Sequence, residues 1–241
     1  MDNDDKQDLP TPTWLTRKET LFEEGEDWEF NVDHSGGGLN VYAQSYRQAA
    51  EQLFSQWETK DHTPPHYALF PLAFLWRQYL ELRLKSLVLD VERLHELGEE
   101  VPTSAQQEKR RKQPGYQPDF PDGHDLLQQW DCLEPMLKSL WPSAPETKFV
   151  RHLLVQFNEV DPLADGFRYP VGSSKKARAR TLSRLPRLVN LRRVNDVMTS
   201  LANVLDGASD HFEVALSDTL EALAWYEAEE AALAGEVDFD R

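Results

Sequence analysis

Apolar side chains recur along most of this chain at the three- and four-residue spacing of an α-helix. The clearest case is the segment from Tyr67 to Leu97, where apolar residues fall at almost every angle around the helix axis. A helix that is apolar on most of its faces usually lies at the centre of a bundle. We therefore predict that residues 67–97 form the core helix of the fold.

Other segments have a single apolar face and are predicted to pack around that core helix. They are residues 39–60, a helix that is capped by Asp122, has Asp125 in its first turn and ends before Pro142, residues 146–160, and one or two long helices over 191–234. Pro135 should kink or restart the second of these. No useful stretch shows the apolar–polar alternation of a β-strand. The pattern therefore predicts an all-α fold, without an internal repeat.

Breaks in the helical pattern predict the domain organisation. Residues 1–29 are rich in Asp, Glu, Thr and Pro and are expected to form a flexible, disordered acidic tail. Residues 30–234 are expected to form a single helical bundle domain with exposed loops at about 98–123 and 161–189, and residues 235–241 a second tail. The triplet Gly36-Gly37-Gly38 lacks the lysine and the preceding strand of a phosphate-binding loop, so it predicts a hinge before a helix.

Composition and charge restrict the classes of protein that fit. The 241 residues are 40% hydrophobic and 28% charged, which is typical of a globular protein with a real core. No apolar run is long enough to cross a bilayer, and the acidic N-terminus is unlike a leader peptide. The single cysteine, Cys132, excludes an internal disulfide and argues against a cysteine-based zinc site. We therefore expect a reduced, cytoplasmic setting and no membrane partner.

The net charge of −16 argues against a protein that binds nucleic acid non-specifically over its whole surface. Basic residues nevertheless gather at 109–112 and between Arg168 and Arg193, so a locally basic face remains open. The second tract could contact phosphates, although a solvated loop is the default interpretation. The seven histidines are scattered without ligand spacing, and no His-Glu-x-x-His helix or nucleophile elbow occurs. Neither a metal ion nor a cofactor is predicted.

A row of charged residues lies inside the predicted core helix. Arg77, Glu81 and Lys85 follow one another at four-residue intervals and therefore share one face, which also carries Phe74 and Leu84. Charges among apolar neighbours are unfavourable unless they are paired. The row is either a structural ion-pair ladder, in which Glu81 bridges Arg77 and Lys85, or a polar pocket of the bundle.

Two further positions are candidates for a site. His124 is predicted in the first turn of its helix, where the helix dipole keeps the imidazole neutral, so it could act as a base, contact a phosphate, or serve the structure alone. Arg168 stands between Phe167 and Tyr169 in a loop. It could anchor a phosphate or a carboxylate, or it could latch the loop by reaching Asp161 or Glu81.

Three parts of the chain carry a resemblance to HEPN-type helical bundle proteins: residues 74–85, residues 123–127, and residues 167–170 followed by a long helix. The resemblance covers roughly residues 40–215. It implies a compact up-and-down bundle, often a homodimer, from a prokaryotic defence or toxin–antitoxin setting. Many proteins of this kind are metal-independent endoribonucleases. Their catalytic signature is an arginine followed, after four to six residues, by a histidine; no histidine here has such an arginine, so these residues cannot be carried over.

The expected function is that of a HEPN-like binding or regulatory component of a prokaryotic defence or stress system. Its ligand would be a nucleotide or RNA, held by Arg77, Glu81, Lys85, His124, Arg168 and Tyr169. One alternative is a metal-independent endoribonuclease, with His124 as general base and Arg77, Glu81 or Lys85 assisting. The other alternative is a non-catalytic dimeric scaffold. A protein partner encoded nearby and a homodimer are the expected assemblies.

Overall fold

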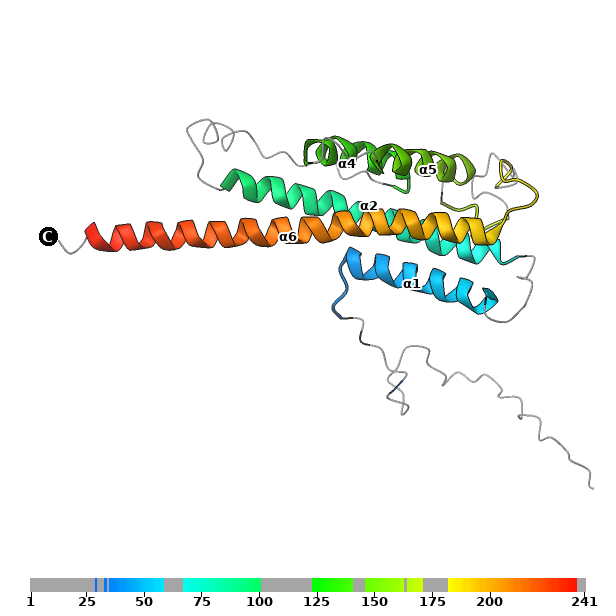
Figure 1. Ribbon diagram of the computed structural model, residues 1–241, viewed down its shortest axis with the longest axis horizontal. Helices are drawn as coiled ribbons and strands as arrows, with labels where there is room; N and C mark the ends of the chain where they lie inside the picture. The colour runs from blue at the N-terminus through cyan, green and yellow to red at the C-terminus, as the bar shows by residue number, and fades with distance from the viewer. Residues whose placement is uncertain are drawn as a thin grey trace, which may run out of the picture. The chain divides into compact units, whose positions relative to one another are not determined.

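The computed structural model describes Glu29, Asp33 and residues 35–58, 67–100, 123–140, 146–162, 164–170 and 182–237. This part of the chain contains no strand and five helices (Figure 1): α1 (Leu39–Glu58), α2 (Leu69–Glu100), α4 (Leu126–Leu140), α5 (Glu146–Val160) and α6 (Leu191–Val237). The predicted all-α fold is confirmed. None of the helices in these ranges combines the length and apolarity that crossing a membrane requires.

The helix boundaries agree closely with the predicted ones. Residues 191–237, predicted as one or two helices, form one helix of 47 residues. Pro135, which was expected to kink or restart its helix, lies inside α4. Several predicted segments fall outside the described residues: almost all of the 1–29 tail, the loop between 101 and 122 with its basic run, and residues 171–181 of the second basic tract.

The contacts divide the chain into two units, residues 1–36 and residues 37–241. The boundary falls within the triplet Gly36-Gly37-Gly38, which the sequence predicts as a hinge. All five helices belong to the second unit.

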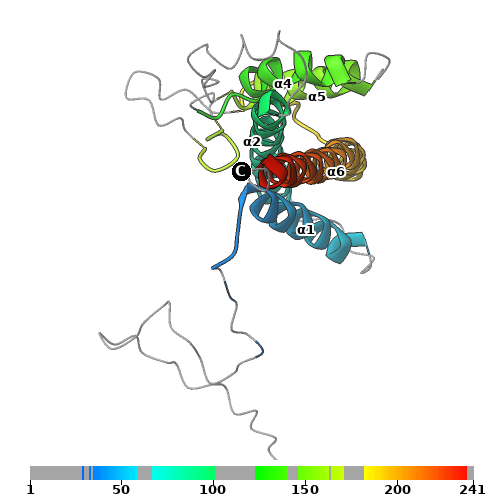
Figure 2. The ribbon, with the colours of Figure 1, turned by 90° about the vertical axis from the view of Figure 1, so that its left-hand side faces the viewer.

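Helix α2 forms the centre of this unit, as predicted. It packs against α1 and α6 on one side and against α4 on the other (Figures 1 and 2). Its apolar residues provide the largest share of the buried core, which includes Leu72, Trp76, Leu80, Leu84, Leu87, Val88 and Val91. Because neighbours cover several sides of α2, a charged side chain on almost any face of this helix lies near protein rather than water.

Helix α1 runs antiparallel to α6. The start of α1 meets the middle of α6 where the side-chain amide of Asn40 donates to Glu213 (3.1 Å), and the end of α1 meets the start of α6 where Arg192 donates to Glu58. Beyond Glu213, α6 therefore extends past α1, and Figure 1 shows its C-terminal end projecting beyond the end of α2.

Helix α4 runs in the same direction as α2. His124, just before α4, contacts Glu81. Cys132 follows two turns later, and its pKa is raised by burial and by the charges of Asp131 and of Glu92 on α2, so Cys132 lies near Glu92. Of the described helices, α2 and α4 thus run parallel to each other. This parallel arrangement places the start of α4 beside the charged row of α2.

Candidate functional site

The start of α4 is formed by an aspartate cap. Oδ1 of Asp125 accepts hydrogen bonds from the backbone N–H groups of Leu127 (2.9 Å) and Gln128 (3.2 Å). This is the pattern of an N-cap, so Asp125 precedes the helix and does not belong to its first turn. Gly123 has a φ of 126°, a conformation that favours glycine, and turns the chain into the cap.

His124 therefore lies before α4 and not in its first turn, so the predicted position was wrong by one to two residues. The physical reason is that the Asp125 carboxylate satisfies the first free N–H groups of the helix, a role predicted for Asp122, which lies outside the described residues. The side chain of His124 contacts Glu81 of α2.

Glu81 is the centre of the charged cluster. Its Oε1 accepts hydrogen bonds from Nζ of Lys85 (2.9 Å) and from Nδ1 of His124 (2.8 Å), and its Oε2 lies 3.6 Å from Nη1 of Arg77. Only 4% of Glu81 is exposed. The charged row thus has the geometry of an ion-pair ladder, and His124 joins it from the neighbouring helix start.

Arg77 occupies the innermost position of the cluster. It is fully buried, and its Nη2 donates to the backbone carbonyl of His124. Nε and Nη1 find no hydrogen-bond partner among the described residues. Burial lowers the pKa of the Arg77 guanidinium, against the attraction of Glu81, Asp161 and Asp125. An arginine keeps its proton at neutral pH despite such a shift, so Arg77 is a buried cation that anchors the His124 backbone.

The protonation of Glu81 decides the tautomer of His124. Burial alone would raise the pKa of the Glu81 carboxyl, but the hydrogen bonds from Lys85 and His124 outweigh it, and the pKa is lowered. Glu81 is therefore ionised at neutral pH and can only accept hydrogen bonds. Nδ1 of His124 must then carry the hydrogen, and Nε2 is the ring nitrogen that is left to contact a ligand.

The imidazole of His124 is at the same time accessible. Its side chain is 58% exposed, in contrast to 5% for Glu81 and 1% for Arg77. A buried carboxylate that orients an exposed imidazole is an arrangement used for general acid–base catalysis and for binding anions. No group of three metal-ligating side chains occurs within the described ranges.

Arg168 and Tyr169 lie in the loop that follows α5. Nε of Arg168 donates to the carbonyl of Ala164 (3.0 Å), and its guanidinium lies 6.0 Å from the centre of the Phe74 ring on α2 and 5.6 Å from that of Tyr169. Arg168 therefore ties the loop to α2 through an aromatic ring. A contact of Arg168 with Asp161 or Glu81, as the latch hypothesis suggests, is absent from the described part of the chain.

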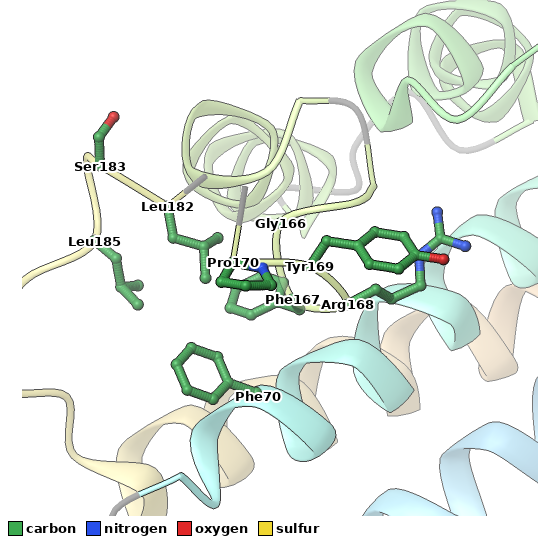
Figure 3. A pocket seen from close by; sticks show the side chains of 9 residues that line it. All are labelled: Phe70, Gly166, Phe167, Arg168, Tyr169, Pro170, Leu182, Ser183 and Leu185. Atoms are coloured by element: carbon green, nitrogen blue, oxygen red, sulfur yellow. The ribbon is translucent and has the colours of Figure 1, made fainter. Parts of the chain in front are cut away.

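The six predicted site residues accordingly form two neighbouring groups. Arg77, Glu81, Lys85 and His124 meet in one cluster, whereas Arg168 and Tyr169 lie over an earlier turn of α2. Phe74 and Glu81 are separated by about 10 Å along the helix axis, at a rise of about 1.5 Å per residue. Arg168 and Tyr169 also line a pocket of ≈ 500 Å³ (Figure 3).

A second polar cluster, on the opposite side of α2, was not predicted. Asp206 of α6 accepts hydrogen bonds from the Tyr79 hydroxyl (2.7 Å) and from Gln44 of α1 (3.0 Å), and it pairs with Arg47 and, at 2.7 Å, with Arg83. The four-residue spacing of Tyr79 and Arg83 was a signal for this cluster. Its acceptor lies more than one hundred positions away, so spacing could not identify it. This cluster joins three helices, and we assign it to the stability of the bundle.

No protein-family model matches this chain, and neither a curated protein nor a solved structure matches it. The comparisons therefore neither support nor contradict the resemblance to HEPN-type proteins.

Proposed function

We propose that this chain is a HEPN-like binding component that holds a nucleotide or RNA through its phosphate at His124 and Lys85. The observation that supports the proposal is the exposed imidazole of His124, whose Nδ1 is held 2.8 Å from the buried Glu81 carboxylate. With Nδ1 engaged by that carboxylate, Nε2 is the ring nitrogen left to contact a phosphate oxygen.

The neighbouring cations support the binding of an anion. Lys85 uses one of its three donors on Glu81 and is partly exposed, so other donors of its ammonium group are free to turn toward a ligand. Arg77 is buried and does not reach the surface. Its role in the proposal is positional: it balances the Glu81 charge and holds the carbonyl of His124.

The test is a binding measurement with a matched histidine control. Wild type, His124→Ala and His152→Ala are incubated with a panel of nucleotides and with mixed RNA, and melting temperature and ligand affinity are recorded. His152 is an exposed histidine of α5 that contacts Gln156. We expect binding by wild type and His152→Ala, and at least about tenfold weaker binding by His124→Ala. Equal binding by His124→Ala, or no binding by wild type, contradicts the proposal.

A metal-independent endoribonuclease is the second candidate, and the orientation of His124 favours it. In this hypothesis neutral Nε2 takes the proton of a ribose 2′-hydroxyl, whose oxygen attacks the adjacent phosphorus. The bond to the 5′ oxygen breaks, that oxygen takes a proton from water, and a cyclic phosphate remains. Lys85 would stabilise the charge that develops on the phosphate.

The same variants separate binding from catalysis. RNA is incubated with each protein in the presence of a chelator, so that contaminating metal-dependent nucleases are inactive. If wild type and His152→Ala cut RNA and a normally folded His124→Ala does not, the ribonuclease hypothesis replaces simple binding. If wild type and His152→Ala bind RNA more tightly than His124→Ala does and all three leave it intact, the binding role stands alone.

The wider biological setting stays a prediction drawn from the HEPN resemblance. It comprises a prokaryotic defence or stress system, a protein partner encoded nearby and a homodimer. A dimeric scaffold without a ligand would lose none of its function in His124→Ala, which distinguishes that alternative from both roles above.

A further inference from the structure

The pocket beside Arg168 has the chemistry of a nucleobase site. It is lined by Phe70 of α2, by residues 166–170 of the loop after α5, and by Leu182, Ser183 and Leu185 of the segment before α6. Figure 3 shows the ring of Phe70 facing Leu182, Leu185 and Pro170 across the pocket. Aromatic and aliphatic side chains form most of its walls, which suits the apolar face of a ring.

Exposed aromatic rings continue beyond the pocket. Phe70 is 39% exposed and stacks on Tyr67, which is 76% exposed; the ring centres are 6.4 Å apart and the planes differ by 19°. Tyr169 is 53% exposed on the other side of the loop. These rings offer more stacking surface than one base can cover, and successive bases of a single strand stack on such rings irrespective of sequence.

The charges along this surface suit a sugar–phosphate backbone. Arg168 is exposed, its guanidinium lies over the rings of Phe74 and Tyr169, and Figure 3 shows Arg168 and Tyr169 side by side above α2. Arg184, which stands between two pocket residues, is exposed as well. The chain as a whole is strongly acidic, so these arginines mark a local exception where an anion can bind.

Helix α2 connects the pocket with the His124 cluster. Phe70 and Glu81 are eleven residues apart on α2, which corresponds to about 16 Å along its axis. Arg168 and Tyr169 lie over the intervening turn of Phe74. A ligand with its base in the pocket and a phosphate at His124 would therefore have to pass Arg168.

We propose that the pocket formed by Phe70, Phe167 and Pro170 binds an unpaired base of single-stranded RNA, whose backbone runs past Arg168 toward His124. This inference rests on the proposed function and specifies its ligand as a single strand. Specificity for sequence is not part of it, because the aromatic and aliphatic pocket walls recognise the face of a base rather than its hydrogen-bonding edge.

The test measures the affinity of labelled single-stranded oligonucleotides about eight nucleotides long, a matching RNA hairpin, and mononucleotides and nucleoside triphosphates as competitors. Phe70→Ala and Tyr169→Ala remove stacking rings, Phe70→Tyr keeps one, and Phe149→Ala removes an exposed ring of α5 that does not line the pocket. We expect each of the first two variants to bind the single strand about tenfold more weakly. Phe70→Tyr and Phe149→Ala should bind like wild type, and thermal melts confirm that all variants are folded.

The outcomes separate this inference from the proposed function. If His124→Ala weakens RNA binding but Phe70→Ala and Tyr169→Ala do not, the base pocket is refuted and the phosphate site stands. Preference for the hairpin, or binding of a nucleoside triphosphate without any single strand, likewise refutes the inference alone. If wild type binds neither RNA nor nucleotides, both proposals fail.

Discussion

Nδ1 of His124 lies 2.8 Å from Oε1 of Glu81, although 43 positions separate the two residues in the chain. The contact exists because α4 begins beside the middle of α2, where the Asp125 cap and the guanidinium of Arg77 hold the chain. A buried carboxylate and an exposed imidazole are joined in this way. The charged row of α2 thus reaches the surface of the bundle.

The Glu81 carboxylate should make stability depend on pH in the acidic range. Its pKa is lowered in the folded protein, so its contribution is complete above the unfolded value of about 4.3 and is lost as pH falls through the folded pKa. We expect Glu81→Gln to be less stable by about 3 kcal/mol near neutral pH, because Arg77 loses its buried partner. Urea unfolding at a series of pH values measures this difference.

The difference between wild type and Glu81→Gln should shrink below the folded pKa, where wild type is protonated as well. Glu159→Gln, on the exposed face of α5, is the control and should follow wild type at every pH. A difference that is equally large at neutral and strongly acidic pH contradicts the assignment of the charge to Glu81.

Asp206 should be a main support of the contact between α1, α2 and α6. Burial and the nearby Asp206 charge raise the pKa of Tyr79, which keeps its hydroxyl protonated as a donor. Asp206→Asn leaves Arg83, which is 1% exposed, without its counter-ion, and we expect a loss of about 3 kcal/mol in the free energy of unfolding. Chemical denaturation provides the measurement. Asp210→Asn, at an exposed site of the same helix, should change it by less than about 0.5 kcal/mol.

Gly166 should tolerate no side chain without a shift of the pocket loop. A Cβ built there would lie 2.7 Å from Cδ2 of Leu182 and 3.1 Å from Oδ1 of Asp161, which accepts the Gly166 N–H. Gly166→Ala is expected to destabilise the protein by about 1 kcal/mol and to move Leu182, which lines the pocket. A fall in melting temperature with weaker binding of single-stranded RNA would agree with this.

At Gly207, in contrast to Gly166, an added side chain is expected to stabilise the protein. Gly207 lies inside α6, and a Cβ there meets no atom within 4 Å. Gly207→Ala should therefore raise the free energy of unfolding by about 1 kcal/mol, because alanine favours the helix and restricts the unfolded chain. Equal effects of the two substitutions would show that the crowding at Gly166 is without consequence.

The predicted homodimer can be tested at the C-terminal part of α6. Trp225 is 60% exposed there, and Val214, three turns earlier on the same face, is exposed too. If two copies of the chain pair through this face, Trp225→Glu should convert a dimer into a monomer in light scattering after gel filtration. A wild-type monomer, or a Trp225→Glu dimer of unchanged stability, contradicts pairing at this face. Asp218→Asn, an exposed change on the same helix, is the control.

The local periodicity of apolar residues was sufficient to predict most of the helices. The central place of α2, the bounds of α5 and the shared face of Arg77, Glu81 and Lys85 follow from the order of residues, because helical geometry repeats every few positions. The boundary of α4 was missed by a few residues, because two aspartates compete for one cap and sequence alone does not rank them.

The candidate sites depend on contacts between distant segments. Spacing in the sequence could not predict that His124 meets Glu81, that Asp206 meets Arg83, or that Leu182 and Phe70 line one pocket. These contacts follow from the direction in which α4 and α6 run along α2 and from the way the loops return to it. The packing of whole helix faces determines these directions, and every buried residue contributes to that packing. No short motif of this chain is therefore sufficient to predict them.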